Sequence, residues 1–342
     1  MSFRVAQLNG FFDEQSLPGL MTEFAVPGMG VTVVEERQIE SRGYGVKKVD
    51  GEAVTPETLF QACSISKPVT AVAVVRLAQE GILDLDEDVN DYLTSWKVPK
   101  MASSQPRVTL RQLLGHVAGT TVHGFPGYEP DSSLPTTVEV LDGKPPANTE
   151  PVRVTGVPGA GFRYSGGGIT IVQQVMTDLL KQPFPTLMRE LVLDPLGMTA
   201  STFEQPLHPS RWPEAATGHH EDGTPVPGGW HVYPEMAAAG LWTTSSDLAR
   251  VIIEVQRAWA GLDTAILSQR TAREMLSPQS GGPVGIGFWV EEGHSVRFFH
   301  GGDNDGFKCL LTGGVDAGTG MVIMTNGQRG DELIDEVRSR IG

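Results

Sequence analysis

Residues 64–81, with the sequence SISKPVTAVAVVRLAQEG, decide how the rest of the chain is interpreted. From Lys67 onward the stretch is apolar on nearly all sides, and it ends in Gly81, a residue type that commonly follows the last turn of a helix. The pattern predicts a buried helix. Ser64 and Lys67 are three residues apart at its start, so they share one face, where the hydroxyl and the amine can approach each other.

A serine at this position has the surroundings that a nucleophile needs. A helix N-terminus supplies free N–H groups and a positive partial charge, which suit a developing oxyanion. A nearby base can take the serine proton and activate the oxygen. The bare S-x-x-K pattern is common by chance, but here it opens an apolar helix and follows Thr58-Leu59-Phe60, a strand-like approach. Ser64 is therefore the candidate nucleophile.

Two further motifs carry chemistry, although each is weak alone. Tyr164-Ser165-Gly166 precedes a predicted helix and offers a phenol that can shuttle protons, or a residue that merely packs in a glycine-rich turn. His300-Gly301-Gly302 follows a strand-like stretch, where two glycines let a substrate backbone approach closely. The alternative for His300 is an exposed side chain in a tight turn.

Strand patterns lie at both ends of the chain, and helix patterns lie between them. Val31–Val34 and the segment around Tyr44 predict a hairpin. The predicted strands near the C-terminus and the final helix are, in order, Val296–Phe299, Phe307–Thr312, Met321–Thr325 and Glu332–Ile341. The expected architecture is α+β, with one antiparallel sheet built from both termini and a mainly helical region inserted.

We expect one unit over residues 1–342, with a sheet region at 25–60 and 285–342 and a mainly helical region at 82–245. A long loop at 119–161 has little periodicity, and such loops are usually functional or mobile. The predicted helices of the inserted region are LRQLLGHVAG after a Thr109 cap, Ile169–Leu180, Thr186–Leu193, and Ser246–Ala258 capped by Ser245 or Ser246.

Taken in order, the three motifs resemble those of the serine β-lactamase and penicillin-binding-protein superfamily. The similarity is to its class C-like branch, which includes family VIII-type carboxylesterases and D-aminopeptidases. Those proteins carry S-x-x-K, then a tyrosine motif (Y-x-N or Y-S-x), then K-T-G or H-x-G. Further similarity extends over LDLDEDVNDYL (83–93), LLGHVAG (113–119), RYSGGG (163–168), LDPLGMTAST (193–202) and PEMAAAGLWTTSSDLAR (234–250). The resemblance implies a β-lactamase/transpeptidase-like fold and no cofactor.

The resemblance also implies roles for the motif residues. Ser64 would be acylated, and Lys67 and Tyr164 would share the general-base work, with the order of proton transfer left open. The backbone N–H groups of Ser64 and Asp303 would form the oxyanion hole. Substrate-binding positions would be His300, Gly301, Gly302 and Gly166.

Two of these positions depart from the family pattern. Gly166 replaces the asparagine of Y-x-N, and His300 replaces the lysine of K-T-G. Both changes weaken recognition of a substrate carboxylate. Because a histidine has a reference pKa of about 6.5, we expect anionic substrates to bind better at pH 6 than at pH 8.

The sequence therefore predicts a serine hydrolase that forms an acyl-enzyme on small carboxylic esters, and on amides including β-lactams. The alternatives are a β-lactamase or a D-stereospecific peptidase such as a D-Ala-D-Ala carboxypeptidase. An alternative of another class is a relative that binds ligands without turnover, but such a protein has no need of Ser64, Lys67 and Tyr164 together.

Composition excludes several other classes. The formal net charge is −15, which opposes binding to nucleic acid or to anionic membranes. Two cysteines cannot form a disulfide framework, and no zinc motif is present, with His219-His220-Glu221-Asp222 expected to be a solvated cluster. The N-terminus lacks a secretory pattern, so a cytoplasmic location is expected. We expect small-molecule substrates as partners, and the sequence leaves the oligomeric state open.

Aromatic residues near the predicted site are expected mainly as packing residues, some of them lining an acyl pocket. The sequence does not separate the two groups, which together comprise Phe125, Tyr128, Trp230, Tyr233, Trp242 and Trp289.

Overall fold

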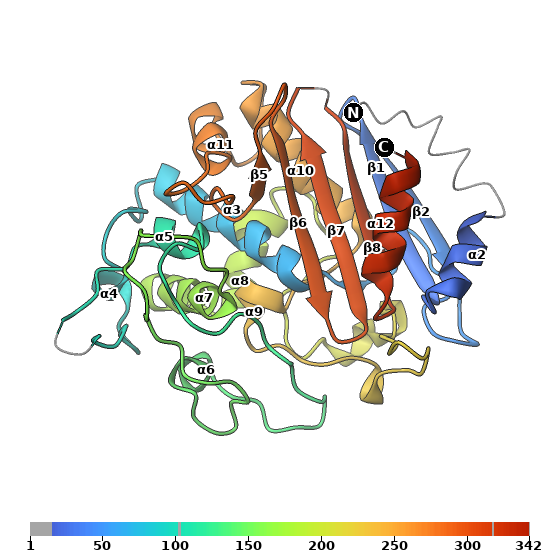
Figure 1. Cartoon of the computed structure of the whole chain (residues 1–342), viewed down its shortest axis with the longest axis horizontal. Helices are drawn as coiled ribbons and strands as arrows, with labels where there is room; N and C mark the ends of the chain where they lie inside the picture. Colours follow the sequence, from blue (N-terminus) through green and yellow to red (C-terminus); the bar gives the residue numbers. More distant parts are fainter. Residues whose placement is uncertain (1–15, 102–103, 317, 342) are drawn as a thin grey trace.

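The two ends of the chain build one antiparallel sheet. The structure, a computed structural model, describes residues 16–101, 104–316 and 318–341. Its sheet has the strand order β2-β1-β8-β7-β6-β5 (Figure 1). The strands are β1 (Gly28–Glu35), β2 (Gln38–Gly45), β5 (Trp289–Glu291), β6 (Arg297–Asn304), β7 (Phe307–Gly314) and β8 (Gly320–Thr325). The α+β class expected from the sequence is confirmed.

The N-terminal hairpin joins the C-terminal strands through β1. Glu36 and Arg37 link β1 to β2 with φ angles of 49° and 63°. Two left-handed residues in a two-residue loop match the twist of the flanking strands. On its other side β1 pairs with β8, with Met29 opposite Thr325. The predicted hairpin is confirmed. Its pairing with β8 joins the two ends of the chain, which are almost 300 positions apart, in one sheet.

Each face of the sheet is covered by helices, because the strands alternate their apolar side chains between two cores. α10 (Ser245–Trp259) packs against β1, β7 and β8 on one face. On the other face, Val31 and Ile323 lie in a separate apolar cluster with residues of α2 (Ser16–Glu23) and α12 (Gly330–Ile341). Figure 1 shows α12 in front of β7 and β8, with α10 behind the sheet.

The helical region packs around α3 (Ser66–Gln79), which is the helix predicted from residues 64–81. Most of its side chains are buried, including those of Val69, Val72 and Val74. The short strands β3 (Phe60–Gln61) and β4 (Trp242–Thr243) pair at its N-terminal end. The other helices of this region are α4 (Val89–Tyr92), α5 (Leu110–Leu114), α6 (Thr137–Asp142), α7 (Gly166–Leu180), α8 (Phe184–Met188), α9 (Met236–Ala239) and α11 (Gln269–Met275), with a π-helical turn at Arg189–Leu193.

Several helix ends differ from the sequence-based expectation, and those of α5 and α10 have a clear structural reason. The helix after Thr109 ends at Leu114, not at Gly119, because His116, with φ 55°, leaves the right-handed helical conformation. α10 is capped by Thr244, whose side chain accepts from the Asp247 N–H, so Ser245 and Ser246 lie inside the helix. The long loop at 119–161 also contains α6, which begins with a capping box at Thr136.

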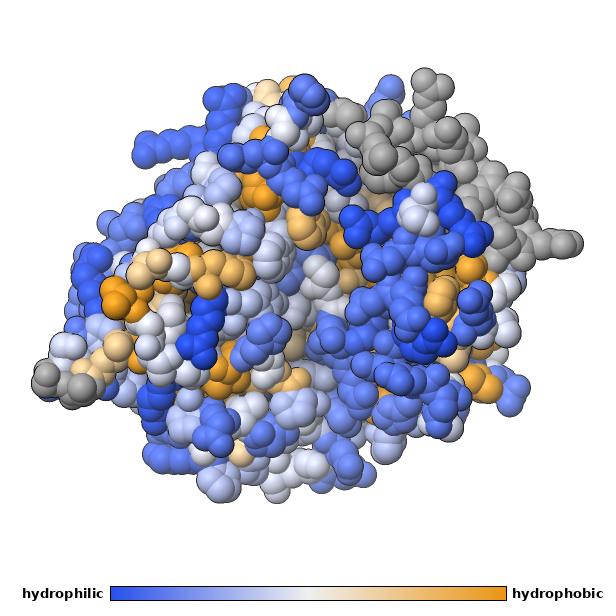
Figure 2. Space-filling view, viewed as in Figure 1, coloured by the Kyte–Doolittle hydropathy of each residue, from blue (hydrophilic) through white to orange (hydrophobic). Residues whose placement is uncertain are grey.

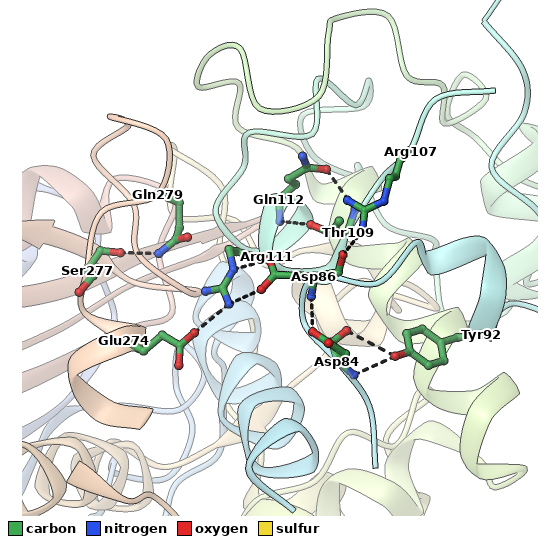
Figure 3. Close-up of polar contacts among 10 residues, drawn as sticks. All are labelled: Asp84, Asp86, Tyr92, Arg107, Thr109, Arg111, Gln112, Glu274, Ser277 and Gln279. Carbon is green, nitrogen blue, oxygen red and sulfur yellow. Dashed lines mark hydrogen bonds and ion pairs between the residues drawn. The ribbon is translucent and has the colours of Figure 1, made fainter. Parts of the chain in front are cut away.

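A polar cluster fixes α5 against its neighbours. The Arg111 guanidinium lies between Asp86 and Glu274 and donates to both carboxylates at 2.7–2.8 Å (Figure 3). This contact holds the pKa of Asp86 below its usual range. It ties the loop after α3 to α5 and α11, and so helps to hold the segment that continues to His116 in place.

The surface follows the acidic composition of the chain. Figure 2 shows largely hydrophilic residues around α12 and smaller groups of apolar residues over the helical region. Among the helices that the structure describes, none has the length and apolar character to cross a bilayer.

Candidate active site

Ser64 lies in a tight turn that the surrounding backbone fixes. Cys63–Ile65 form a 3₁₀ turn between β3 and α3, and Cys63 has a φ of 51°. The Ser66 hydroxyl donates to the Cys63 carbonyl at 2.6 Å and accepts from the Leu241 N–H at 3.0 Å. These bonds compensate for the unfavourable φ angle of Cys63. Ser64 itself is only partly buried, so its oxygen is presented at the surface of the turn.

Lys67 is brought to Ser64, as the spacing predicts. Its ammonium donates to Ser64 Oγ at 2.8 Å and to the Ala238 carbonyl of α9 at 2.8 Å. The side chain is only 2% exposed. A buried amine needs such partners, because burial of an unpaired polar group is costly. The lysine is thus held against the candidate nucleophile by a carbonyl from a different part of the chain.

Tyr164 completes this group. It precedes α7, whose cap Ser165 accepts from the Gly168 N–H at 2.9 Å. The Lys67 ammonium lies 5.1 Å from the centroid of the Tyr164 ring, a distance typical of a cation–π contact. The structure therefore brings together Ser64, Lys67 and Tyr164, although Tyr164 lies 100 positions after Ser64 in the sequence.

His116 supports Tyr164, a role that the sequence alone did not indicate. The His116 carbonyl accepts from the Arg163 N–H at 2.7 Å, and its Nδ1 accepts from the Ser165 N–H at 3.2 Å. Its ring lies 4.3 Å from the Tyr164 ring, centroid to centroid. Burial, with the charge of Lys67, holds the pKa of His116 well below its usual value. The only signal in the sequence was its place in LLGHVAG.

α9 begins next to a second buried group that the sequence did not single out. Glu235 precedes α9, and both of its carboxylate oxygens are buried without a hydrogen-bond partner among the described residues. Burial raises its pKa to about 7. The Ala238 carbonyl of α9 accepts a hydrogen bond from Lys67. Glu235 therefore precedes, by three residues, the residue that binds the lysine.

The His300-Gly301-Gly302 triplet lies inside β6, so the expected strand end at Phe299 is wrong. β6 continues to Asn304, with His300 opposite Leu311 and Gly302 opposite Cys309 of β7. At Gly302 a Cβ atom would lie 2.6 Å from the Ala62 carbonyl, so only glycine lets β6 approach this closely. The segment that it approaches is the turn Cys63–Ile65, which carries the candidate nucleophile and is called the nucleophile turn below. The alternative of an exposed histidine in a turn is also excluded, since His300 is 2% exposed.

The expected positive charge on His300 near pH 6 is wrong as well. Burial, and then the nearby charge of Lys67, lower the pKa of His300 to about 3. Its Nδ1 lies 2.6 Å from the Gly301 carbonyl oxygen. The imidazole is neutral at pH 6 and at pH 8, so it offers no charge to an anionic substrate over that range.

The remaining predicted positions occupy different surroundings. Asp303 follows the triplet in β6, and its largely exposed carboxylate forms an ion pair with Lys308. The Gly166 N–H donates to the His123 carbonyl at 2.9 Å, and a Cβ at this residue would lie 2.8 Å from the Phe125 ring. Gly166 occupies the sequence position of the asparagine of Y-x-N. The Phe125 ring fills the space that a side chain at this position would enter.

The aromatic residues divide into two groups. The Trp289 ring stacks on the Tyr164 ring at a centroid distance of 6.4 Å and borders the site. Trp230 and Trp242 instead form an edge-to-face pair at 5.2 Å in the core. We expected residues 219–222 to be a solvated cluster, and this expectation is wrong for His219. Its side chain is fully buried, and its Nδ1 lies 2.9 Å from the Asn326 carbonyl oxygen.

Comparison with known proteins identifies the family to which the chain belongs. The Beta-lactamase family model matches residues 14–340. Protein flp of Staphylococcus aureus (strain N315) is 24% identical over 321 residues, which cover 88% of this chain and 60% of that protein. Esterase EstB of Burkholderia gladioli is 30% identical over 187 residues, or 52% of this chain and 45% of that protein. The chain spans about 60% of the length of the first of these curated relatives.

Solved structures share the fold. D-alanine carboxypeptidase AmpC of Burkholderia cenocepacia aligns with a TM-score of 0.77 at 22% identity, covering 99% of both chains. D-amino acid amidase of Ochrobactrum anthropi SV3 aligns with a TM-score of 0.73 at 21% identity, covering 95% of this chain and 97% of that one. The family model matches nearly the whole chain, and the chain therefore belongs to the beta-lactamase family.

Proposed function

We propose that this protein is a serine hydrolase that cleaves small carboxylic esters, and amides including β-lactams, through an acyl-enzyme on Ser64. The contact that carries the proposal is the 2.8 Å hydrogen bond between Lys67 Nζ and Ser64 Oγ. A hydroxyl in contact with a buried amine and close to a phenol has the parts for nucleophilic catalysis. A relative that only binds ligands has no use for this arrangement.

In the proposed reaction, Ser64 Oγ attacks the carbonyl carbon of the substrate. The serine proton passes to whichever of Lys67 and Tyr164 is in its base form, the neutral amine or the phenolate, and then to the leaving alkoxide or amine as the carbonyl–heteroatom bond breaks. Water attacks the resulting ester at Ser64, and its proton returns to the serine oxygen by the same groups. The acid product is released and the enzyme is regenerated.

The oxyanion hole in this proposal consists of the N–H groups of Ser64 and Asp303. β5 pairs with β6 only as far as Phe299. Beyond that residue, no described strand covers this edge of β6, so backbone groups there are available to a substrate. The close approach of Gly302 to Ala62 sets this edge beside the nucleophile turn.

Neutral substrates fit this site best. Neutral His300 replaces the fixed cation of K-T-G, and the position of the Y-x-N amide is covered by Phe125. An acylated D-amino acid or a β-lactam thus loses one expected partner for its carboxylate and one for its acylamino group. The esterase activity in the printed name of EstB is in keeping with ester substrates. The cytoplasmic location and the absence of nucleic-acid and membrane partners stay predictions.

Steady-state turnover tests the proposal directly. Wild type and Ser64→Ala should be assayed with p-nitrophenyl acetate, a penicillin and a D-Ala-D-Ala peptide. We expect the ester to have the highest kcat/KM, and its turnover to fall by about three powers of ten or more in Ser64→Ala. A folded Ser64→Ala variant that keeps more than about a tenth of the wild-type rate would contradict the proposal. Higher kcat/KM for the penicillin or the peptide would point instead to a β-lactamase or a D-peptidase.

A further inference from the structure

The His300 side chain points toward the catalytic group. Successive side chains of a strand alternate between its faces, so His300, Gly302 and Asn304 of β6 share one face. Gly302 on this face abuts the Ala62 carbonyl, and Asn304 donates to Gln61 Oε1 at 2.7 Å. The His300 ring, one pleat further along, lies 6.2 Å from the Tyr164 ring. His300 is therefore part of the wall of the site.

The contacts of His300 fix which of its ring nitrogens carries the proton. Nδ1 lies 2.6 Å from the Gly301 carbonyl oxygen, which can only accept, so Nδ1 must carry the hydrogen. A neutral imidazole has one hydrogen, and Nε2 is then left with a free lone pair. Nε2 is buried and has no hydrogen-bond partner among the described residues. It is an unpaired acceptor.

The charged group near this acceptor is the Lys67 ammonium, which contributes to the lowered pKa of His300. Two of its three N–H groups are bound to Ser64 Oγ and to the Ala238 carbonyl, which leaves at most one for a facing carboxylate. Asp303 lies on the opposite face of β6 from His300, where its exposed carboxylate pairs with Lys308. A substrate carboxylate facing Nε2 would bury two acceptors against each other, which is costly, whereas a donor would satisfy the unpaired nitrogen.

We propose that His300 Nε2 accepts a hydrogen bond from the substrate, so that the site selects substrates with a neutral donor, such as a primary carboxamide or a hydroxyl, over those with a carboxylate at the same position. The proposal rests on the hydrolase function above and specifies its substrate class. A site with a buried polar group discriminates strongly against ligands that leave that group unpaired. The lysine of K-T-G can only donate hydrogen bonds, whereas His300 Nε2 can only accept one here. The replacement therefore turns a donor for the substrate into an acceptor.

Boronic acids that bind the serine nucleophile provide a matched test. Inhibition of ester hydrolysis at pH 7.5 should be measured for 3- and 4-carbamoylphenylboronic acid and for the corresponding carboxyphenylboronic acids, which have nearly the same shape. Salt at about 0.3 M screens the net negative charge of the protein. For the isomer that reaches His300, we expect wild type to bind the carbamoyl compound about tenfold more tightly than the carboxy compound, or better.

Two variants locate the effect. In His300→Lys the preference should shift by about tenfold or more toward the carboxy compound. The control His294→Lys adds the same charge at an exposed residue just before β6 and should keep the wild-type ratio within about twofold. Equal or inverted affinities in wild type, or an unchanged ratio in His300→Lys, would overturn the proposal. An acceptor that the protein seals off from ligands would give equal affinities.

A second measurement keeps the proposal testable if His300→Lys does not fold. In ¹⁵N-labelled wild type, His300 Nε2 should keep the chemical shift of an unprotonated imidazole nitrogen from pH 8 to pH 5. A protonated Nε2 in that range would overturn the proposal. If none of the boronic acids inhibits wild type, the proposed nucleophile fails, and this inference fails with it.

Discussion

At the scale of single residues, His116 contacts the chain on both sides of Tyr164. It binds the N–H groups of Arg163 and Ser165, and its ring contacts the Tyr164 ring at an interplanar angle of 33°. Its φ of 55° is unfavourable for most side chains but is tolerated by asparagine. We regard His116 as a positioning residue, because it acts on the substrate only through Tyr164.

Two substitutions at His116 separate the contributions of its ring and its nitrogen. In His116→Asn the side-chain oxygen can still accept from the Ser165 N–H, whereas His116→Phe keeps a ring and leaves that buried donor unpaired. We expect kcat to fall about tenfold further in His116→Phe than in His116→Asn, with little change in KM, because an unpaired buried N–H costs about 1–3 kcal/mol. Equal losses in the two variants, or a loss confined to KM, would argue against a positioning role.

Lys67 and Tyr164 should behave as one unit. Because the proposed proton transfer uses both residues, Lys67→Ala or Tyr164→Phe alone should lower kcat/KM nearly as much as the double substitution does. The measurement is a double-mutant cycle on one neutral ester. If the losses multiply in the double variant, one of the two residues has a structural role only.

At the scale of elements, α9 combines a contact to Lys67 with the buried Glu235 carboxyl. The pKa of Glu235 is raised to about 7 in the folded protein, so the folded state binds this proton more tightly than the unfolded chain does. The resulting stabilisation is complete below the ordinary pKa of a glutamate and is lost as the pH rises through about 7.

Glu235→Gln removes this titration. The free energy of unfolding of Glu235→Gln, relative to wild type, should therefore increase by about 2–3 kcal/mol between pH 5 and pH 8. Urea denaturation at the two pH values measures it, and the same substitution at an exposed glutamate, Glu204→Gln, serves as the matched control. A constant difference between Glu235→Gln and wild type would show that the carboxyl titrates normally.

The elements that the sequence predicts well are long and periodic. α10 buries one face over several turns, α7 is buried on nearly all sides, and β7 and β8 are buried along almost their whole length. Short elements carry too few residues for a periodic signal. β5 has three residues and α9 has four, so neither was predicted, although β5 brings Trp289 to the site and α9 holds Lys67.

The site was predictable in its residues more than in its electrostatics. Ser64 and Lys67 share a local spacing that fixes their approach, whereas the charge of His300 depends on burial by distant segments. The two glycines after His300 suggested the end of a strand, but pairing with β7 extends β6 through them. Lys67 is held by a backbone carbonyl, and a carbonyl group has no signature in the sequence.

At the scale of the whole molecule, the sheet built from both termini sets the candidate catalytic group, Ser64, Lys67 and Tyr164, at the junction with the helical region. β6 supplies one wall through His300 and Gly302, and the nucleophile turn at the start of α3 supplies the other. Tyr164 enters at the start of α7. The central claim that follows from this assembly is that Ser64 becomes covalently acylated during turnover.

Mass spectrometry of the intact protein and then of its proteolytic digest tests that claim most directly. Wild type and Ser64→Ala should be mixed with p-nitrophenyl acetate, quenched in acid within the first turnovers, and digested to locate any adduct. We predict that wild type gains one acetyl group on the peptide containing Ser64 and that Ser64→Ala gains none. An acetyl group on another residue of wild type, or the same adduct in Ser64→Ala, would contradict the account.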